Sequence, residues 1–188
     1  MLSHFLIHQR FVFLLLCIIS FQTLAQSAFQ PYNTGGDNII HVTAADFDDV
    51  GVKDYVVCMS VHGKIKAYDR PALHPQGSSP LLWEYSTPVS FNIMIKAAQA
   101  NTQSPGEEIL IPGTDGKLRI LSSEGSLLSE WSVGSGAMYC ADTGQTSSGQ
   151  TVIITGGVDG NVYFLDESGN QLAAETPENK GVVRRVVT

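Results

Sequence analysis

The sequence predicts an all-β fold built from repeated four-stranded antiparallel sheets, and a repeated hairpin is the first reason. An apolar run, a turn with glycine and a second apolar run follow one another three times, at residues 56–69, 108–121 and 152–166. The turn glycines are Gly63, Gly116 and Gly160. Gly or Asp-Gly between two such runs marks a tight hairpin, and a primed turn needs the positive φ that glycine adopts without steric cost.

Further short apolar runs flank each hairpin and are separated by turn residues, which is the second reason. In the first unit the predicted strands are 39–45, 55–60, 65–68 and 81–86. In the second unit they are 92–98, 108–111, 117–121 and 127–132. In the third unit they are 137–141, 151–155, 161–165 and 171–175. Residues 182–188 (VVRRVVT) align with the first strand of the first unit, so they are predicted to begin a fourth.

The spacing of the units is the third reason, because four strands every ~40–50 residues is typical of β-propeller blades. The blades are expected at about 38–90, 91–136 and 137–181, with the next beginning at 182–188. An apolar column on the inner strands is expected to pack blade against blade, and it consists of Val42, Ile95, Met138 and Val186. Closed propellers generally use about four to eight blades, so this one is expected to be incomplete. The missing blades would come from a longer chain or from self-association, or a partner would cap the exposed faces.

Residues 1–25 have the pattern of a secretory signal peptide. His4, His8 and Arg10 precede an apolar core at 11–21, and Ala25 is a small residue at a plausible cleavage point. That core is short for a membrane span, although a retained signal anchor is the alternative. Large residues before Cys17 argue against a lipoprotein signal. Residues 26–37 are predicted to be a flexible leader, and the mature chain to be secreted or periplasmic.

Composition excludes some partners. The formal net charge is −7 and no basic cluster is apparent, which argues against nucleic acid and against anionic membrane. A protein or a glycan ligand stays open, and no membrane insertion is expected after signal removal. Cys58 and Cys140 are interpreted as buried free thiols because each lies in an apolar strand, with a disulfide as the alternative.

Two stretches resemble known propeller repeats. Residues 45–57 (ADFDDVGVKDYVV) resemble the FG-GAP or VCBS-type repeat, and residues 113–131 (GTDGKLRILSSEGSLLSEW) resemble the quinoprotein-like repeat. Together the resemblance covers about residues 39–188. It implies propeller architecture and says little about activity. Quinone-cofactor enzymes of this type carry an adjacent cysteine pair, which this chain lacks.

The FG-GAP resemblance implies a Ca²⁺ site in the acidic turn 46–54. Asp46, Asp48 and Asp54 match three ligand positions of that repeat, and Val52 would offer its carbonyl oxygen. The chain departs from the pattern at residue 50, where a valine replaces a ligand, and this should weaken the site. The alternative is an acidic turn whose carboxylates accept hydrogen bonds from nearby backbone N–H groups.

Other polar and aromatic residues have simpler explanations. Asp115 and Asp159 recur with their turn glycines, so turn geometry accounts for them. Trp83, Tyr85 and Trp131 could line a sugar-binding face, but their repeated position favours packing between blades. The histidines at 41, 62 and 74 lack a second histidine at ligand spacing.

No sequence motif of a hydrolase elbow, a P-loop or a zinc protease is present. The sequence therefore predicts a secreted or periplasmic, non-catalytic binding module, with calcium stabilisation as an option. One alternative is the propeller part of a secreted polysaccharide-active enzyme, a lyase or a hydrolase. Another is a scaffold in envelope assembly.

Overall fold

The computed structural model describes residues 34–70, 80–178 and 181–187. One compact unit, Thr34–Asp69 with Pro80–Thr188, holds all of the described strands; the other unit is Met1–Asn33 with Arg70–Ser79, in which only Arg70 is described. The predicted signal peptide 1–25, residues 26–33 of the leader, His74 and Thr188 lie outside the described residues. Within the described part, no helix has the length and apolar character needed to cross a membrane.

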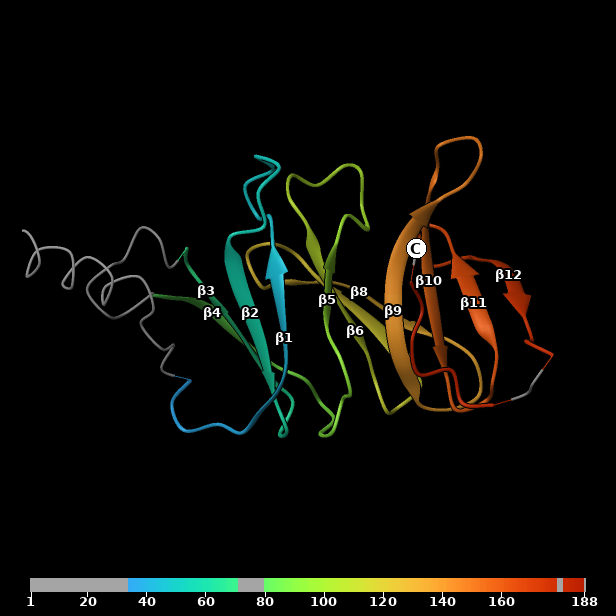
Figure 1. The fold of residues 1–188 in the computed structure, drawn as a ribbon, viewed down its shortest axis with the longest axis horizontal. Helices are drawn as coiled ribbons and strands as arrows, with labels where there is room; N and C mark the ends of the chain where they lie inside the picture. The colour runs from blue at the N-terminus through green and yellow to red at the C-terminus, as the bar shows by residue number, and fades with distance from the viewer. Residues whose placement is uncertain (1–33, 71–79, 179–180, 188) are drawn as a thin grey trace, which may run out of the picture. The chain divides into compact units, whose positions relative to one another are not determined.

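Three four-stranded antiparallel sheets make up the described part of the chain, so the predicted fold class is confirmed: a partial β-propeller (Figure 1). The first sheet is β1 (Ile39–Ala45), β2 (Tyr55–Ser60), β3 (Lys64–Tyr68) and β4 (Leu81–Ser86). The second is β5 (Lys96–Ala98), β6 (Glu108–Pro112), β7 (Lys117–Leu121) and β8 (Leu127–Ser132). The third is β9 (Met138–Gln145), β10 (Thr151–Gly157), β11 (Val162–Leu165) and β12 (Gln171–Glu175). Each sheet keeps its strands in chain order.

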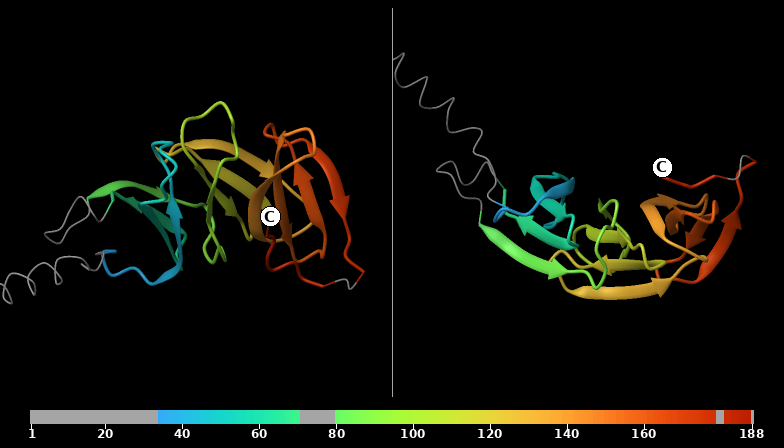
Figure 2. Two further views of the ribbon diagram at one scale, coloured as in Figure 1. Left: turned by 45° about the horizontal axis from the view of Figure 1, so that its top comes forward. Right: turned by 90° about the horizontal axis from the view of Figure 1, so that it is seen from below.

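The sheets stand next to one another with equivalent strands adjacent. Figures 1 and 2 show β1, β5 and β9 as the edge strands on one side, while β4, β8 and β12 form the opposite edges. We call β1, β5 and β9 the inner strands. The β1–β2, β5–β6 and β9–β10 connections all lie at one end of the sheets, which we call the loop end, and the glycine turns lie at the other end (Figure 1).

Two apolar clusters fill the spaces between the sheets. The cluster between the first and second sheets includes Met59, Ile65, Ile95 and Ile111, all with 0% of their surface exposed. The cluster between the second and third sheets is of the same kind. It contains Leu110, Leu118, Met138, Tyr163 and others. The second sheet thus buries apolar side chains on both of its faces, which explains why β6 carries a continuous apolar run.

The glycine turns differ from the primed turns that the sequence predicted. Gly63, Gly116 and Gly160 have φ of 78°, 79° and 78°, and the described non-glycine residues with positive φ are Asp49 and Phe91. The residue before each turn glycine therefore keeps a negative φ. Each turn glycine donates its N–H to the carbonyl three residues back, at 3.0, 3.1 and 3.4 Å. This is a type I turn followed by a left-handed glycine, so only one position requires glycine.

Three predictions about the inner strands are wrong. Val42 is 57% exposed, because it lies on the face of β1 opposite the one that packs on the second sheet. Ile95 and Met138 are fully buried, but they do not share one column. Met138 pairs with Gly157 as Ile39 pairs with Ser60, so Met138 is equivalent to Ile39 and not to Val42. Residues 92–95 precede β5 rather than extending it.

Residues 181–187 have no strand assignment, contrary to prediction, but they follow the path of an inner strand. The N–H of Val183 donates to Gly157 O at 2.9 Å, just as the N–H of Met138 donates to Gly113 O at 3.0 Å one unit earlier. A strand requires a hydrogen-bonded neighbour, and no described strand lies beyond this segment. The segment is thus placed as an inner strand without a second strand to pair with.

Candidate functional site

The acidic turn 46–54 connects β1 and β2 at the loop end, and Asp46 organises it. The Asp46 carboxylate accepts the N–H groups of Gly51 at 2.7 Å and Val50 at 3.2 Å. Gly51 and Asp49 take the positive φ values, 80° and 56°, that bend the chain around this carboxylate. Burial raises the pKa of Asp46, but the hydrogen bonds from Gly51 and Val50 outweigh it, so the pKa is lowered overall.

The other predicted calcium ligands turn to different partners. The Tyr55 hydroxyl donates to Asp48 Oδ2 at 3.4 Å, and the Val52 carbonyl accepts the N–H of Asp54 at 3.0 Å. Across the described residues, no three Asp, Glu, His or Cys side chains gather closely enough to hold a metal ion. In this conformation the carboxylates do not fit a Ca²⁺ site, and the hydrogen bonds of Asp46 are those of the alternative, an acidic turn. Calcium binding at Asp46, Asp48, Val52 and Asp54 stays a prediction.

The acidic turn instead contacts the second sheet, which sequence reasoning missed. Two hydrogen bonds join Asp46 and Glu107: Asp46 N–H donates to the side-chain Oε2 of Glu107 at 3.0 Å, and Glu107 N–H donates to the backbone oxygen of Asp46 at 2.8 Å. Lys53 Nζ lies 2.5 Å from Glu107 Oε1. A Cβ at Gly106 would come within 2.3 Å of the Phe47 carbonyl oxygen, so glycine is required for this approach. The turn therefore joins two blades.

A buried carboxylate organises the equivalent loop of the second sheet. Glu108 is 1% exposed, and its Oε2 accepts the N–H groups of Ala100 at 2.9 Å and Asn101 at 3.1 Å. Burial raises the pKa of Glu108, although these two hydrogen bonds oppose the shift. Glu108 thus performs from a strand the same bonding to loop N–H groups that Asp46 performs within its turn.

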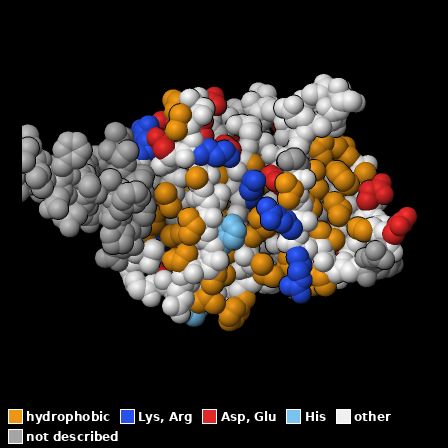
Figure 3. All heavy atoms as spheres, in the orientation of Figure 1, with side chains coloured by type: hydrophobic (Ala, Val, Ile, Leu, Met, Phe, Trp, Pro, Cys, Tyr) orange, Lys and Arg blue, Asp and Glu red, His pale blue; other side chains and the backbone are white. Residues whose placement is uncertain are grey.

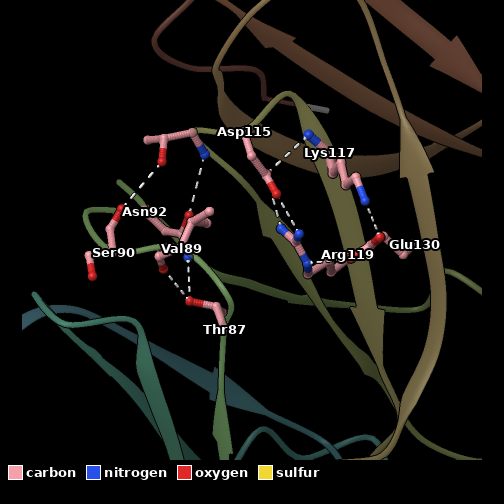
Figure 4. A network of polar contacts seen from close by, with 9 residues as sticks. Thr87, Val89, Ser90, Asn92, Asp115, Lys117, Arg119 and Glu130 are labelled. Atoms are coloured by element: carbon pink, nitrogen blue, oxygen red, sulfur yellow. Dashed lines mark hydrogen bonds and ion pairs between the residues drawn. The ribbon is translucent and has the colours of Figure 1, made fainter.

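The recurring turn aspartates are structural, as the sequence predicted, and each also contacts a strand residue. Figure 4 shows this contact for Asp115 and Arg119. Asp115 Oδ2 lies 2.5 Å from Arg119 Nη2, and Arg119 Nε donates to Glu130 Oε2 at 2.8 Å. In the third sheet the Tyr163 hydroxyl, at the position equivalent to Arg119, donates to Asp159 Oδ2 at 2.6 Å. The guanidinium holds the pKa of Asp115 below its ordinary value.

The aromatic residues of the outer strands pack between blades, which confirms their prediction. Trp83 and Tyr85 pack on the first apolar cluster and Trp131 packs on the second. Trp83 Nε1 also donates to Ser123 O at 2.8 Å, and a Cβ at Gly125 would lie 2.5 Å from the Trp83 ring. These partly buried rings therefore have a structural role in packing between blades.

Cationic side chains lie on the face of the inner strands. Figure 3 shows Lys and Arg side chains in the middle of this face, among apolar ones. Lys96 on β5 lies 3.3 Å from Asp142 on β9, and the side chains of Arg184 and Arg185 are exposed. His41 on β1 accepts the N–H of Ile95 through Nδ1 at 3.5 Å, and burial lowers its pKa. Arg184 and Arg185 thus carry exposed charged donors on the segment 181–187.

Both cysteines of the described chain, Cys58 and Cys140, are free and buried, as the sequence predicted. Burial raises the pKa of each thiol, which keeps it protonated and unreactive. Cys140 Sγ lies 3.6 Å from the Gly156 carbonyl oxygen. The thiols are packing residues and supply no chemistry to a site.

The fold and these surfaces define a β-propeller whose loops and inner strands carry its polar groups. The Lambda-carrageenase beta-propeller domain family matches residues 72–179, and the chain belongs to this family. No curated protein matches the chain significantly.

Two solved structures share the fold at low identity. The first is BamB from Moraxella catarrhalis, with a TM-score of 0.53 and 15% identity over 77% of this chain and 39% of that one. The second is the computationally designed Ika8 protein, with a TM-score of 0.54 and 15% identity over 78% of this chain and 38% of that one. The chain therefore spans about two fifths of the length of either structure, and both likenesses concern the fold alone.

Proposed function

We propose that the chain is a non-catalytic, glycan-binding propeller module of a secreted polysaccharide-active protein. The family match over residues 72–179 carries this proposal, because the family takes its name from an enzyme that acts on carrageenan. Secretion is supported by the signal pattern of residues 1–25. The propeller would then hold the polysaccharide near catalytic residues located elsewhere.

The inner-strand face is the surface proposed to bind the polysaccharide. Arg184 and Arg185 are exposed and lie on the segment that follows an inner-strand path beside β9. Arginine binds planar or tetrahedral oxyanions through two donors at once, which suits sulfate or carboxylate groups on a glycan. The chain is acidic overall, so a local arginine pair is needed for an anionic glycan to approach.

Calorimetry with the mature chain tests this function. We expect binding of lambda-carrageenan, a sulfated polysaccharide, that weakens as salt rises. The double variant Arg184→Ala/Arg185→Ala should bind at least about tenfold more weakly, since each charge-assisted contact contributes roughly 1.5–3 kcal/mol. Lys64→Ala, which removes an exposed lysine paired with Glu84, is the matched control and should bind normally. Unchanged binding by the double variant would refute the proposal that this surface binds the polysaccharide.

The enzyme alternative is favoured by the same family name and is separated by a second measurement. If the chain itself cleaves the polysaccharide, incubation with lambda-carrageenan will release new reducing ends or unsaturated ends. The binding-module proposal expects neither product. Either product, reproducible with independently purified chain, would replace the proposal with a lyase or hydrolase activity.

A further blade is the proposed partner of the third sheet. Residues 181–187 would form the inner strand of this blade. The proposal is supported by the close packing of this segment on the third sheet, where a Cβ at Gly156 would meet Val183 at 2.7 Å. The blade could come from a longer chain or from a second copy. Light scattering on the purified chain distinguishes these sources. A particle with twice the mass of one chain indicates self-association, whereas the mass of a single chain favours a longer chain as the source.

Calcium stabilisation, which the FG-GAP and VCBS resemblance implies for Asp46, Asp48, Val52 and Asp54, requires the acidic turn to rearrange. The Asp46 carboxylate would have to exchange the N–H groups of Gly51 and Val50 for the ion. The unfolding experiment described in the Discussion tests this proposal.

A further inference from the structure

A pocket of about 430 Å³ lies at the loop end of the second and third sheets. Thr102 comes from the β5–β6 loop, Gln150 and Thr151 from the β9–β10 hairpin, Glu167 from the β11–β12 turn and Leu172 from β12. Pockets for small ligands typically have volumes of ~300–1,000 Å³, so this one is large enough for a sugar unit.

The walls of this pocket are held in place before any ligand arrives. The Glu167 carboxylate accepts Thr102 Oγ1 at 3.0 Å and Thr102 N–H at 3.4 Å, which ties the loop of one sheet to the turn of the next. Asp166 Oδ1 accepts the N–H groups of Asn170 at 2.8 Å and Ser168 at 2.9 Å. A ligand would therefore not have to order these loops, which lowers the cost of binding.

The chemistry of the lining decides the class of ligand. Hydroxyl, amide and carboxylate groups line the pocket, and none of its described lining residues is Lys or Arg. Asp166 and Glu167 would repel a sulfate or a carboxylate, whereas their remaining lone pairs can accept hydrogen bonds from sugar hydroxyls. Leu172 is 55% exposed and offers an apolar surface to the C–H face of a sugar ring.

We infer that this pocket binds one uncharged, hydroxyl-rich sugar unit of a polysaccharide, at a place distinct from Arg184 and Arg185. The inference rests on the proposed function for the choice of a glycan. It adds a second subsite, with a preference opposite to that of the arginine pair: the arginines take anionic groups and the pocket takes a sugar unit that lacks them.

The repeat supplies a matched control for Leu172. Leu165 pairs with Gln171 as Leu121 pairs with Leu127, so Leu172 and Leu128 occupy equivalent positions on β12 and β8. Leu128 is 45% exposed and does not line the pocket. Because both leucines are about half exposed, we expect Leu172→Ala and Leu128→Ala to have similar effects on the fold.

The test is a calorimetric titration of the mature chain with an uncharged galactose oligosaccharide. Leu172→Ala and Gln150→Ala should each weaken binding by roughly tenfold, because the apolar contact of the leucine with the sugar or a pair of hydrogen bonds is lost. Leu128→Ala should bind as the wild type does. Equal effects of Leu172→Ala and Leu128→Ala, or no binding of the oligosaccharide, would overturn the inference.

Two further titrations separate the pocket inference from the proposed function and from cation binding. A chain that binds lambda-carrageenan but no uncharged oligosaccharide would sink the pocket inference and keep the proposed function, while a chain that binds neither would sink both. Titration with CaCl₂ alone examines Asp166 and Glu167 as cation ligands. Binding of Ca²⁺ that Glu167→Gln abolishes, together with no effect of Leu172→Ala on sugar, would replace the inference.

Discussion

Asp115→Ala should destabilise the second blade, because it removes the main partner of a buried charge. Arg119 has 1% of its side chain exposed, and the side chains of Asp115 and Glu130 are 25% and 31% exposed. Removing one partner of a buried ion pair costs roughly 3–5 kcal/mol, but here Glu130 remains bound and both carboxylates reach solvent. We therefore expect a loss of about 2–3 kcal/mol in the free energy of unfolding.

Urea unfolding followed by tryptophan fluorescence at neutral pH measures this loss, and a double-mutant cycle isolates the pair. The coupling between Asp115→Ala and Arg119→Met should be about 1.5–2 kcal/mol. The same cycle at the equivalent positions, Asp159→Ala with Tyr163→Phe, should give about 1 kcal/mol or less, since that hydrogen bond is to a neutral hydroxyl. Equal couplings in the two blades would refute the reasoning that the buried charge makes the difference.

Acid should weaken the same interaction. The pKa of Asp115 is lowered in the folded state by Arg119, so its contribution to stability is fully present above the unfolded pKa of about 3.9. That contribution is lost as the pH falls through the folded pKa. The coupling measured below pH ~3 should consequently be smaller than at neutral pH, and an unchanged coupling would contradict the assignment.

Three other changes test separate features. Gly125→Ala should cost about 2 kcal/mol or more, because its φ is +81° and the new Cβ would meet Trp83 at 2.5 Å, whereas Gly149→Ala, with the same φ and nothing within 4 Å, should cost about 1 kcal/mol. Glu108→Gln should flatten the pH dependence of unfolding: the pKa of Glu108 is raised in the folded state, so the wild type loses stability as the pH rises from about 4 through that pKa. For calcium, we expect the ion to raise the melting temperature of the wild type and not that of Asp46→Ala; an equal shift in both, or none in either, would contradict a site at this turn.

The outer strands were the easiest to predict from sequence. The bounds of β4, β8 and β12 match the predicted 81–86, 127–132 and 171–175, because these exposed strands are flanked by clear turn residues. The inner strands were harder. Whether Val42 faces a neighbouring blade depends on the side on which that blade stands, and an isolated strand pattern does not contain this information.

The roles of the polar residues also divide into those that the sequence predicts and those that depend on packing between blades. The structural role of Asp115 was predictable because the residue recurs with its glycine, but the burial of Arg119 was not. In the run Lys117-Leu118-Arg119 both charged residues fall on the face of β7 that an alternating pattern assigns to solvent. Similarly, Glu107 bonds to a residue 61 positions away, and only the packing of one blade on the next brings the two together.

The bond from Met138 N–H to Gly113 O has a consequence for how the protein is made. The carbonyl that opens the turn of one blade also accepts the first hydrogen bond of the next blade's inner strand, and Val183 N–H repeats this arrangement with Gly157 O. A folded blade thus offers a hydrogen-bond acceptor to the segment that follows it in the chain, and this segment can pack on the blade during synthesis. Folding can therefore proceed blade by blade in the direction of synthesis.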